Sequence, residues 1–266
     1  MKRNIIAIGG GKIMVPRNRV PQTSLIDKSI VQQVKRKSPR VLFIPTASED
    51  NADYCDAFRN QYEKRLGCSV QELLLYRDRP SNRKIQMLIA ESDIIYVGGG
   101  NTLRMMKLWR QLGVDNYLDK ARKRGAVLCG LSAGAICWFR QGNSDSRKFK
   151  NKSNKTLIKV TGLNYADLLM CPHYDVEKHR QPSLKKMMKT TQGVAIGLEN
   201  NAALHIKDDQ YRILASQKDK KAYLIYWNRG KYVKQALMPS DNFQPLMELS
   251  KGSVSKRPVS IDIMIN

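Results

Sequence analysis

One short segment, residues 130–134 (GLSAG), has the composition of a serine nucleophile held in a sharp turn. The apolar run 126–129 precedes it and the apolar run 135–139 follows it, so we expect a buried strand before the turn and a helix after it. Small residues on both sides of Ser132 let the chain turn tightly and direct the hydroxyl outward. Because free N–H groups gather at a helix N-terminus, the N–H of Ala133 is a candidate oxyanion donor. A turn that serves only packing is the alternative.

A serine hydroxyl needs a general base to act as a nucleophile, and the sequence contains three histidines, His173, His179 and His205. His173 follows the apolar run 168–171, and active-site groups of α/β sheets lie at the carboxyl ends of strands. His179 lies in a highly charged segment typical of a solvated helix start. His205 lies within an apolar run, where a buried structural histidine is expected. His173 is therefore the predicted base.

The imidazole of such a base is usually oriented by an acidic residue. Glu199 is the predicted acid because it directly follows the apolar run 194–198, again at a strand end. Asp145, in the polar segment after the nucleophile, is the second candidate, and Asp175 competes with both. The order serine, histidine, acid differs from the order serine, acid, histidine of the α/β-hydrolase fold. It therefore predicts a different fold.

A glycine cluster at residues 98–102 (GGGNT) also follows an apolar run. Glycine lets the backbone approach a ligand closely, and Asn101 or Thr102 can cap the helix that follows. Neither this cluster nor the glycine-rich segment 9–12 has the spacing of a dinucleotide or phosphate loop, and we expect no cofactor. In a hydrolase the N–H of Gly100 would be the second oxyanion donor. A tight turn without chemistry is the alternative.

The elements that must position these residues follow from the hydrophobic pattern. Apolar runs at 4–9, 41–47, 69–75, 93–100 and 126–132 predict strands, and residues 23–37, 52–66, 81–91 and 101–112 predict helices. Alternation of this kind predicts an α/β fold with a mainly parallel sheet. Later runs are short and closely spaced, which predicts a peripheral antiparallel β-meander. They lie at 194–198, 202–206, 211–215, 222–227 and 231–236.

No repeat or low-complexity linker divides the chain. We therefore expect one domain over residues 1–266, with its core at about 3–236 and a loosely packed tail at 237–266. The segment 141–156, rich in Ser, Asn and Lys, is predicted to be an exposed loop.

Composition narrows the class of protein. No apolar run approaches the roughly 18 residues that a membrane span requires, and the N-terminal apolar run is too short for a signal peptide and fits a first strand. We expect a cytoplasmic protein.

The formal net charge of +24 favours a solvated lysine-rich surface, with a functional contact to polyanions as the alternative. Five cysteines without a CxxC pair indicate buried, reduced thiols and no metal site.

Four segments in this order resemble the motifs of one family: GGGNT (98–102), GLSAGA (130–135), CPHY (171–174) and GLEN (197–200). The family is that of peptidase E (α-aspartyl dipeptidase) and cyanophycinase, which are serine peptidases. The resemblance runs from about residue 3 to about residue 236. It implies a three-layer flavodoxin-like fold like that of the class I glutamine amidotransferase domain.

The resemblance also implies roles for individual residues. They are Ser132 as nucleophile, His173 as base, Glu199 as third member with Asp145 as the alternative, and the N–H groups of Gly100 and Ala133 as the oxyanion hole.

Peptidase E-like enzymes cleave dipeptides with an N-terminal aspartate, which implies a serine hydrolase that acts on small acidic peptides through an acyl-enzyme on Ser132. A cation must bind the substrate carboxylate, and arginine can do so with two hydrogen bonds. Arg180 is the candidate, with Asn101 and Thr102 lining the pocket. A cyanophycinase-like hydrolase of an aspartate–arginine polymer and a non-catalytic basic binding module are the alternatives. We expect a small peptide as partner, no membrane or nucleic acid, and a monomer or homodimer.

Overall fold

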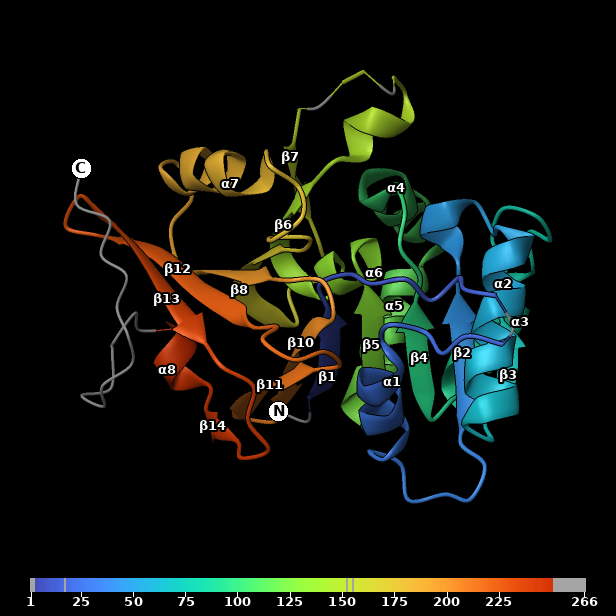
Figure 1. Ribbon diagram of the computed structural model, residues 1–266. Helices are drawn as coiled ribbons and strands as arrows, with labels where there is room; N and C mark the ends of the chain where they lie inside the picture. Colours follow the sequence, from blue (N-terminus) through green and yellow to red (C-terminus); the bar gives the residue numbers. More distant parts are fainter. Residues whose placement is uncertain (1–2, 17, 152, 155, 251–266) are drawn as a thin grey trace.

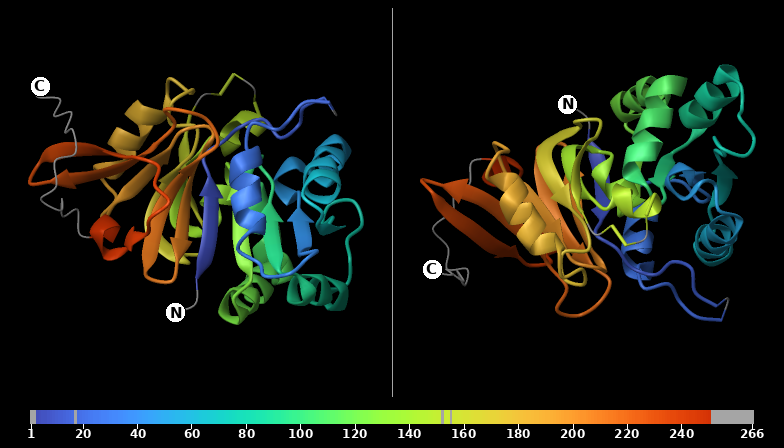
Figure 2. Two further views of the ribbon diagram at one scale, coloured as in Figure 1. Left: turned by 60° about the horizontal axis from the view of Figure 1, so that its bottom comes forward. Right: turned by 90° about the horizontal axis from the view of Figure 1, so that it is seen from above.

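The computed structural model describes residues 3–16, 18–151, 153–154 and 156–250, whose strands form two sheets that lie side by side (Figures 1 and 2). The central strands of the first sheet are parallel and three antiparallel strands extend one edge. Its order is β14 (Gln244–Pro245), β11 (Gln210–Ala215), β10 (Ala202–Lys207), β1 (Asn4–Ile8), β5 (Val127–Leu131), β4 (Ile94–Val97), β2 (Arg40–Ile44) and β3 (Ser69–Glu72).

Helices cover both faces of the parallel strands, which gives three layers (Figure 1). One face carries α3 (Asn82–Glu91), α4 (Thr102–Leu112) and α5 (Val114–Arg124). The other carries α1 (Ser24–Val31) and α2 (Ala52–Arg59), which continues as a π-helix over Asn60–Arg65. Because side chains alternate along a strand, Ile5 and Ala7 of β1 join the first core, and Ile6 and Ile8 the second. The predicted α/β, flavodoxin-like class is confirmed.

Local sequence explains where these helices begin. The side chains of Asn51, Ser81 and Asn101 accept a hydrogen bond from the N–H three residues further on and so cap α2, α3 and α4. Along α4, Met106 and Trp109 are buried, whereas Leu103 is exposed.

The second sheet has six strands, and its three central strands, β9, β8 and β6, are parallel to one another. Its order is β13 (Lys231–Leu237), β12 (Ala222–Asn228), β9 (Ala195–Leu198), β8 (Ala166–Cys171), β6 (Phe139–Ser144) and β7 (Ile158–Thr161). One hydrophobic cluster contains residues of both sheets, among them Ala7 and Met170. Helix α7 (Arg180–Met188) packs on the other face of the second sheet.

The antiparallel runs near the C-terminus do not all join one edge. β10 and β11 form a hairpin at the edge of the first sheet, as the pattern predicts. β9, β12 and β13 belong to the second sheet, where β9 is parallel to β8. Alternation along a strand indicates that it is half-buried but not which strand lies beside it, so the division into two sheets is set by tertiary packing.

The predicted loop at 141–156 begins later than expected, because β6 continues to Ser144 and a short 3₁₀ helix, η3, follows over Ser146–Phe149. Asn143, Ser144 and Ser146 are polar yet buried, and each is hydrogen-bonded within the protein. Hydrogen bonding removes the cost of burial, which composition alone does not reveal.

Part of the predicted tail is structured: β14 and α8 (Met247–Ser250) follow β13, and Leu249 is buried. Residues 251–266 of that tail lie outside the described residues.

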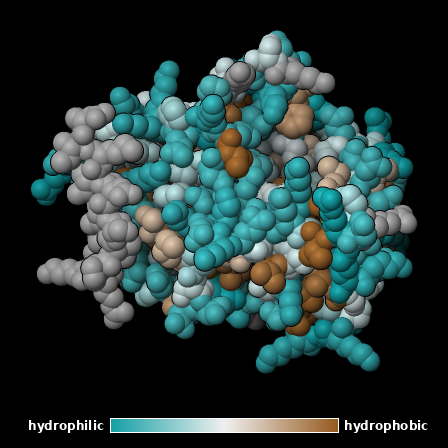
Figure 3. All heavy atoms as spheres, in the orientation of Figure 1, coloured by the Kyte–Doolittle hydropathy of each residue, from teal (hydrophilic) through white to brown (hydrophobic). Residues whose placement is uncertain are grey.

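All five cysteines are free and buried, as predicted. The face in Figure 3 is chiefly hydrophilic, with apolar residues in separate small patches, which fits the predicted solvated surface. Within the described ranges, no helix combines the length and the apolar character that a membrane crossing needs.

Candidate active site

Ser132 lies in a sharp turn between β5 and the short helix α6 (Ala133–Ile136). Its φ of 56° and ψ of −105° are rare for a residue with a side chain. The turn packs so closely on β4 that a Cβ at Gly134 would lie 2.0 Å from the carbonyl oxygen of Val97. The N–H of Ser132 donates to the carbonyl of Ile8 at 3.0 Å, which fixes the turn at the end of β1. This strained conformation leaves Ser132 partly exposed.

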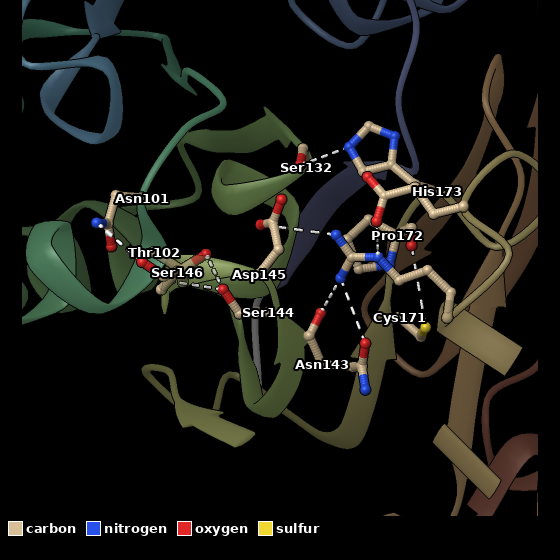
Figure 4. Close-up of polar contacts among 12 residues, drawn as sticks. Asn101, Thr102, Ser132, Asn143, Ser144, Asp145, Ser146, Cys171, Pro172 and His173 are labelled. Carbon is tan, nitrogen blue, oxygen red and sulfur yellow. Dashed lines mark hydrogen bonds and ion pairs between the residues drawn. The ribbon is translucent and has the colours of Figure 1, made fainter. Parts of the chain in front are cut away.

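His173 follows β8 of the second sheet and meets Ser132 at the end of β1. Its Nε2 lies 2.8 Å from Ser132 Oγ (Figure 4). The residue has a φ of 54°, and its N–H donates to the carbonyl of Gly9 at 3.0 Å. The last residues of β1 and the glycine after it therefore hold both backbones, and the predicted nucleophile and base lie within hydrogen-bonding distance.

The partner of the other imidazole nitrogen differs from the prediction. His173 Nδ1 lies 2.8 Å from Oδ1 of Asn200. The carboxylate of Glu199 instead accepts hydrogen bonds from the N–H of Lys221 and the hydroxyl of Tyr223. Neighbouring residues in a turn point in different directions, so Glu199 at the strand end faces β12 while the next residue reaches the imidazole. A search restricted to acidic residues misses Asn200, although an amide oxygen can accept the same hydrogen bond.

Asp145, the alternative acid, does not contact His173 either. Its Oδ1 lies 3.6 Å from Nη2 of Arg180. Arg180 is 1% exposed, and its Nε donates to Glu177 at 2.6 Å while Nη1 donates to the carbonyl of Asn143. The predicted substrate cation is therefore buried in a cluster with two carboxylates.

Asn101 and Thr102, predicted to line the pocket, are buried, and their side chains serve the fold. Asn101 caps α4, and its amide donates to the carbonyl of Ser146 at 3.4 Å. The hydroxyl of Thr102 accepts from Ser144 at 3.2 Å. Figure 4 shows both side chains apart from the Ser132–His173 pair. They thus attach the segment after β6 to the start of α4.

Two backbone N–H groups are candidate oxyanion donors: Ala133 directly follows Ser132, and Gly100 follows Gly99, where a Cβ would lie 3.6 Å from the Cβ of Ser132. Within the part of the chain that the structure describes, neither the N–H of Gly100 nor that of Ala133 has a hydrogen-bond acceptor. Gly100 has a φ of 142°, and a Cβ there would lie 2.1 Å from the carbonyl oxygen of Ala47. Only glycine fits this position, because a side chain would displace the loop that presents the N–H.

The glycine-rich segment after β1, to which sequence assigned no role, is also part of the site. A Cβ at Gly10 would lie 2.5 Å from His173 Nδ1 and 2.1 Å from Asn200 Oδ1. The absent side chain is what gives room for the imidazole and the amide to meet.

The environment of His173 favours its neutral form. Burial lowers the pKa of the imidazole, and the positive charge of Arg180 lowers it further. The hydrogen bond to Asn200 and the negative charges of Glu177 and Asp145 oppose this change without cancelling it. An imidazole that is neutral at neutral pH can accept the proton of a serine hydroxyl.

The other two histidines lie elsewhere. His205 is buried in β10, where its Nε2 lies 3.0 Å from Asn4 Oδ1, and burial lowers its pKa to about 3. His179 precedes α7 and is exposed. The described residues contain no group of three or more His, Cys, Asp or Glu side chains placed to hold a metal ion.

Comparison with known proteins agrees with this fold. The family described as Peptidase family S51 matches residues 5–214. The uncharacterized peptidase YgaJ of Bacillus subtilis (strain 168) is 36% identical over 227 residues, which cover 84% of this chain and 92% of that protein. Peptidase E of Citrobacter koseri (strain ATCC BAA-895 / CDC 4225-83 / SGSC4696) is 45% identical over 47 residues, 18% of this chain and 20% of that protein.

A solved structure shares the fold: a peptidase from an acI-B1 Actinobacterium superposes with a TM-score of 0.66 at 18% identity. The superposition covers 92% of this chain and 97% of that chain. Because the family match covers well over half of the sequence and a relative at 36% identity spans most of it, this chain belongs to peptidase family S51, as its four motifs predict.

Proposed function

We propose that this peptidase is a serine-type enzyme that cleaves short peptides through an acyl-enzyme on Ser132. The observation that carries the proposal is the 2.8 Å contact between Ser132 Oγ and His173 Nε2. The N–H groups of Gly100 and Ala133, which have no acceptor among the described residues, would complete the site. A nucleophile, a neutral base and two oxyanion donors are the parts that acyl transfer needs, and here three turns supply them.

The reaction follows from this arrangement. His173 Nε2 takes the proton of Ser132 as the hydroxyl attacks the peptide carbonyl, and the negative oxygen is stabilised by the N–H groups of Gly100 and Ala133. The imidazolium then gives its proton to the leaving amine as the C–N bond breaks. Water, deprotonated by His173, hydrolyses the ester and releases the acyl group. Throughout, Nδ1–H donates to the amide oxygen of Asn200, which keeps the correct tautomer.

We further propose that the preferred substrates are small peptides with an N-terminal aspartate. Arg180 supports this choice, although most of its hydrogen bonds are made within the protein. Its Nη2 lies 3.6 Å from Asp145, beyond ordinary hydrogen-bond distance, but the side chain is 1% exposed, so binding of a substrate carboxylate requires Arg180 to become accessible. The carboxylate of Asp145 lies beside it and can accept from a substrate ammonium group. The net charge of +24 also attracts acidic substrates.

A dipeptide panel tests the proposal. Asp-Ala, Asn-Ala and Ala-Ala are incubated with the protein and with its Ser132→Ala variant, together with an aspartate polymer that carries arginine branches. We expect hydrolysis of Asp-Ala well above that of the other two dipeptides and none by the variant. Preferred cleavage of the polymer would assign the cyanophycinase-like alternative. Equal turnover by the variant would refute the serine mechanism.

Asn200, the partner of His173 Nδ1, carries no charge, and this leads to a prediction about the pH dependence of activity. Because the pKa of His173 lies below its ordinary value, we expect kcat/KM to keep its plateau down to a pH below about 6.5. In Asn200→Asp, a carboxylate beside Nδ1 stabilises the imidazolium, so the acid limb should move up by about one pH unit or more. Asn200→Ala adds no charge: it should lower kcat without that upward movement. If Asn200→Asp leaves the limb in place, Asn200 is not the partner of His173 in solution.

A further inference from the structure

The turn that carries Asn200 is attached to the loop that carries His173 through one carboxylate. We propose that the ion pair of Asp175 and Lys220 is a positioning device that holds Asn200 against the imidazole of His173. The proposal rests on the proposed serine mechanism, and it assigns a function to two residues that do not touch the reacting atoms.

Asp175 connects two loops. Its Oδ1 accepts the N–H of Asn200 at 2.9 Å, and its Oδ2 lies 2.6 Å from Nζ of Lys220. Asp175 comes two residues after His173, and Lys220 comes from the loop between β11 and β12. Three loops from distant parts of the sequence therefore meet at one side chain.

The other hydrogen bonds of the turn hold the residues on either side of Asn200. The carboxylate of Glu199 binds the start of β12 on one side of Asn200, and the N–H of Asn201 donates to the carbonyl of Gly10 at 2.9 Å on the other. Between these two anchors, the N–H of Asn200 donates to Asp175 at 2.9 Å, and the carbonyl of the same peptide unit, that of Glu199, accepts from the N–H of Ala202 at 3.2 Å. Loss of the Asp175 bond would leave this peptide unit with one of its two hydrogen bonds and so loosen the backbone next to the amide side chain of Asn200.

Geometry and charge indicate that the pair is more than a solvated surface contact. Residue 175 lies in an exposed segment, but its side chain is 16% exposed and that of Lys220 is 28% exposed. Burial raises the pKa of Asp175, but the hydrogen bonds from Lys220 and from the N–H of Asn200 outweigh it, so the pKa lies below its ordinary value. Asp175 is thus ionised at neutral pH. A hydrogen bond to an ionised acceptor is shorter and stronger than a neutral one.

The alternative is an ion pair with no measurable effect, as is common at protein surfaces. The two interpretations differ in what they predict for chemistry. If the ion pair positions Asn200, its removal changes how well His173 activates Ser132 and so changes kcat. If it does not, its removal changes neither kcat nor KM.

The test compares Lys220→Met, Lys220→Arg and Asp175→Ala with the matched control Lys218→Met. Lys218 is an exposed lysine of the same loop. Two readouts are taken: kcat and KM on the dipeptide that the wild type cleaves, and the rate at which a fluorophosphonate labels Ser132. We expect Asp175→Ala to lower kcat and the labelling rate about 10- to 100-fold at little changed KM. Lys220→Met should show a smaller loss in the same direction, Lys220→Arg should recover most of it, and Lys218→Met should match the wild type.

A double variant separates positioning from general destabilisation. If the pair acts as a unit, Asp175→Ala with Lys220→Met should lose no more than Asp175→Ala alone. Additive losses, or kcat and labelling within twofold of wild type in Asp175→Ala, would overturn the proposal. Absence of labelling and hydrolysis in the wild type would instead refute the serine mechanism, so the two failures are distinguishable. Rates are normalised to the folded fraction measured by circular dichroism.

Discussion

Replacing Ser132 with alanine is expected to lower kcat for peptide hydrolysis by about 10⁵- to 10⁶-fold, the size of loss seen when a catalytic serine is removed. In the proposed mechanism the hydroxyl oxygen bonds to the substrate carbonyl, and no other hydroxyl is shown within reach of His173 Nε2 among the described residues. Alanine keeps the Cβ and the backbone of the turn, so the fold should be retained. The measurement is kcat by amine release, with circular dichroism and the unfolding midpoint as the check on structure.

Two further variants serve as matched controls. One is His173→Ala alone, and the other combines His173→Ala with Ser132→Ala. Because nucleophile and base act as one unit, the double variant should be about as inactive as either single variant. Fluorophosphonate should label the wild type at Ser132 and label neither variant at that position. A Ser132→Ala protein that keeps more than about a hundredth of wild-type kcat would place the nucleophile elsewhere.

The second large effect is on stability and arises at Asp27, which has no part in the proposed reaction. This carboxyl on α1 is fully buried and accepts hydrogen bonds from Thr23, Gln61 and Tyr62, but no cation faces it among the described residues. Burial raises its pKa from 3.8 to about 7, against the lowering effect of those hydrogen bonds. Ionisation of Asp27 therefore opposes folding.

The sign of the pH dependence follows. The unfolded chain loses this proton near pH 3.8 and the folded chain near pH 7, so stability is highest below the first value and falls as the pH rises through the second. With about 1.4 kcal/mol for a difference of one in pKa, the fall is on the order of 4 kcal/mol. An asparagine side chain at this position cannot ionise, so the stability gained by Asp27→Asn over the wild type should grow by about that amount between pH 4 and pH 8.

Urea unfolding followed by tryptophan fluorescence at pH 4, 6 and 8 measures this gain. Asp119→Asn is the control of opposite sign, because hydrogen bonding to Lys123 and Arg122 lowers the pKa of Asp119. Its loss of stability relative to wild type should be almost fully present at pH 4 and change little up to pH 8, because a lowered pKa places the whole change at or below about pH 3.8. If the wild type and Asp27→Asn show parallel stability curves over this range, Asp27 has an ordinary pKa in the folded protein.

Local patterns located the elements that hold the site with good accuracy. The runs around Ser132 and before His173 are strands that end where predicted, since a run of buried apolar residues bounded by small or polar residues encodes a strand in itself. Ser132 and His173 could be singled out for the same reason: a nucleophile elbow has a local signature, and only three histidines compete for the role of base.

Contacts between turns were not predictable in this way. Glu199 and Asn200 are adjacent in sequence, and which of them faces His173 depends on the course of a turn fixed by Gly10, Asp175 and Tyr223. The sequence predicts that Arg180 binds the substrate carboxylate, because it is a cation close to the base along the chain. Its neutralisation by Glu177 and Asp145 comes from two different loops.

The sequence by itself determined the α/β class, the turn at Ser132, the histidine predicted as its base and the family to which the chain belongs. Each of these is encoded by local segments of the chain. The tertiary structure decided the division into two sheets, the amide partner of the imidazole and the ion pair of Asp175 and Lys220 next to it. Those features depend on which loops converge at the end of β1, and contacts between segments that are distant along the chain leave no periodic signal in any one of them.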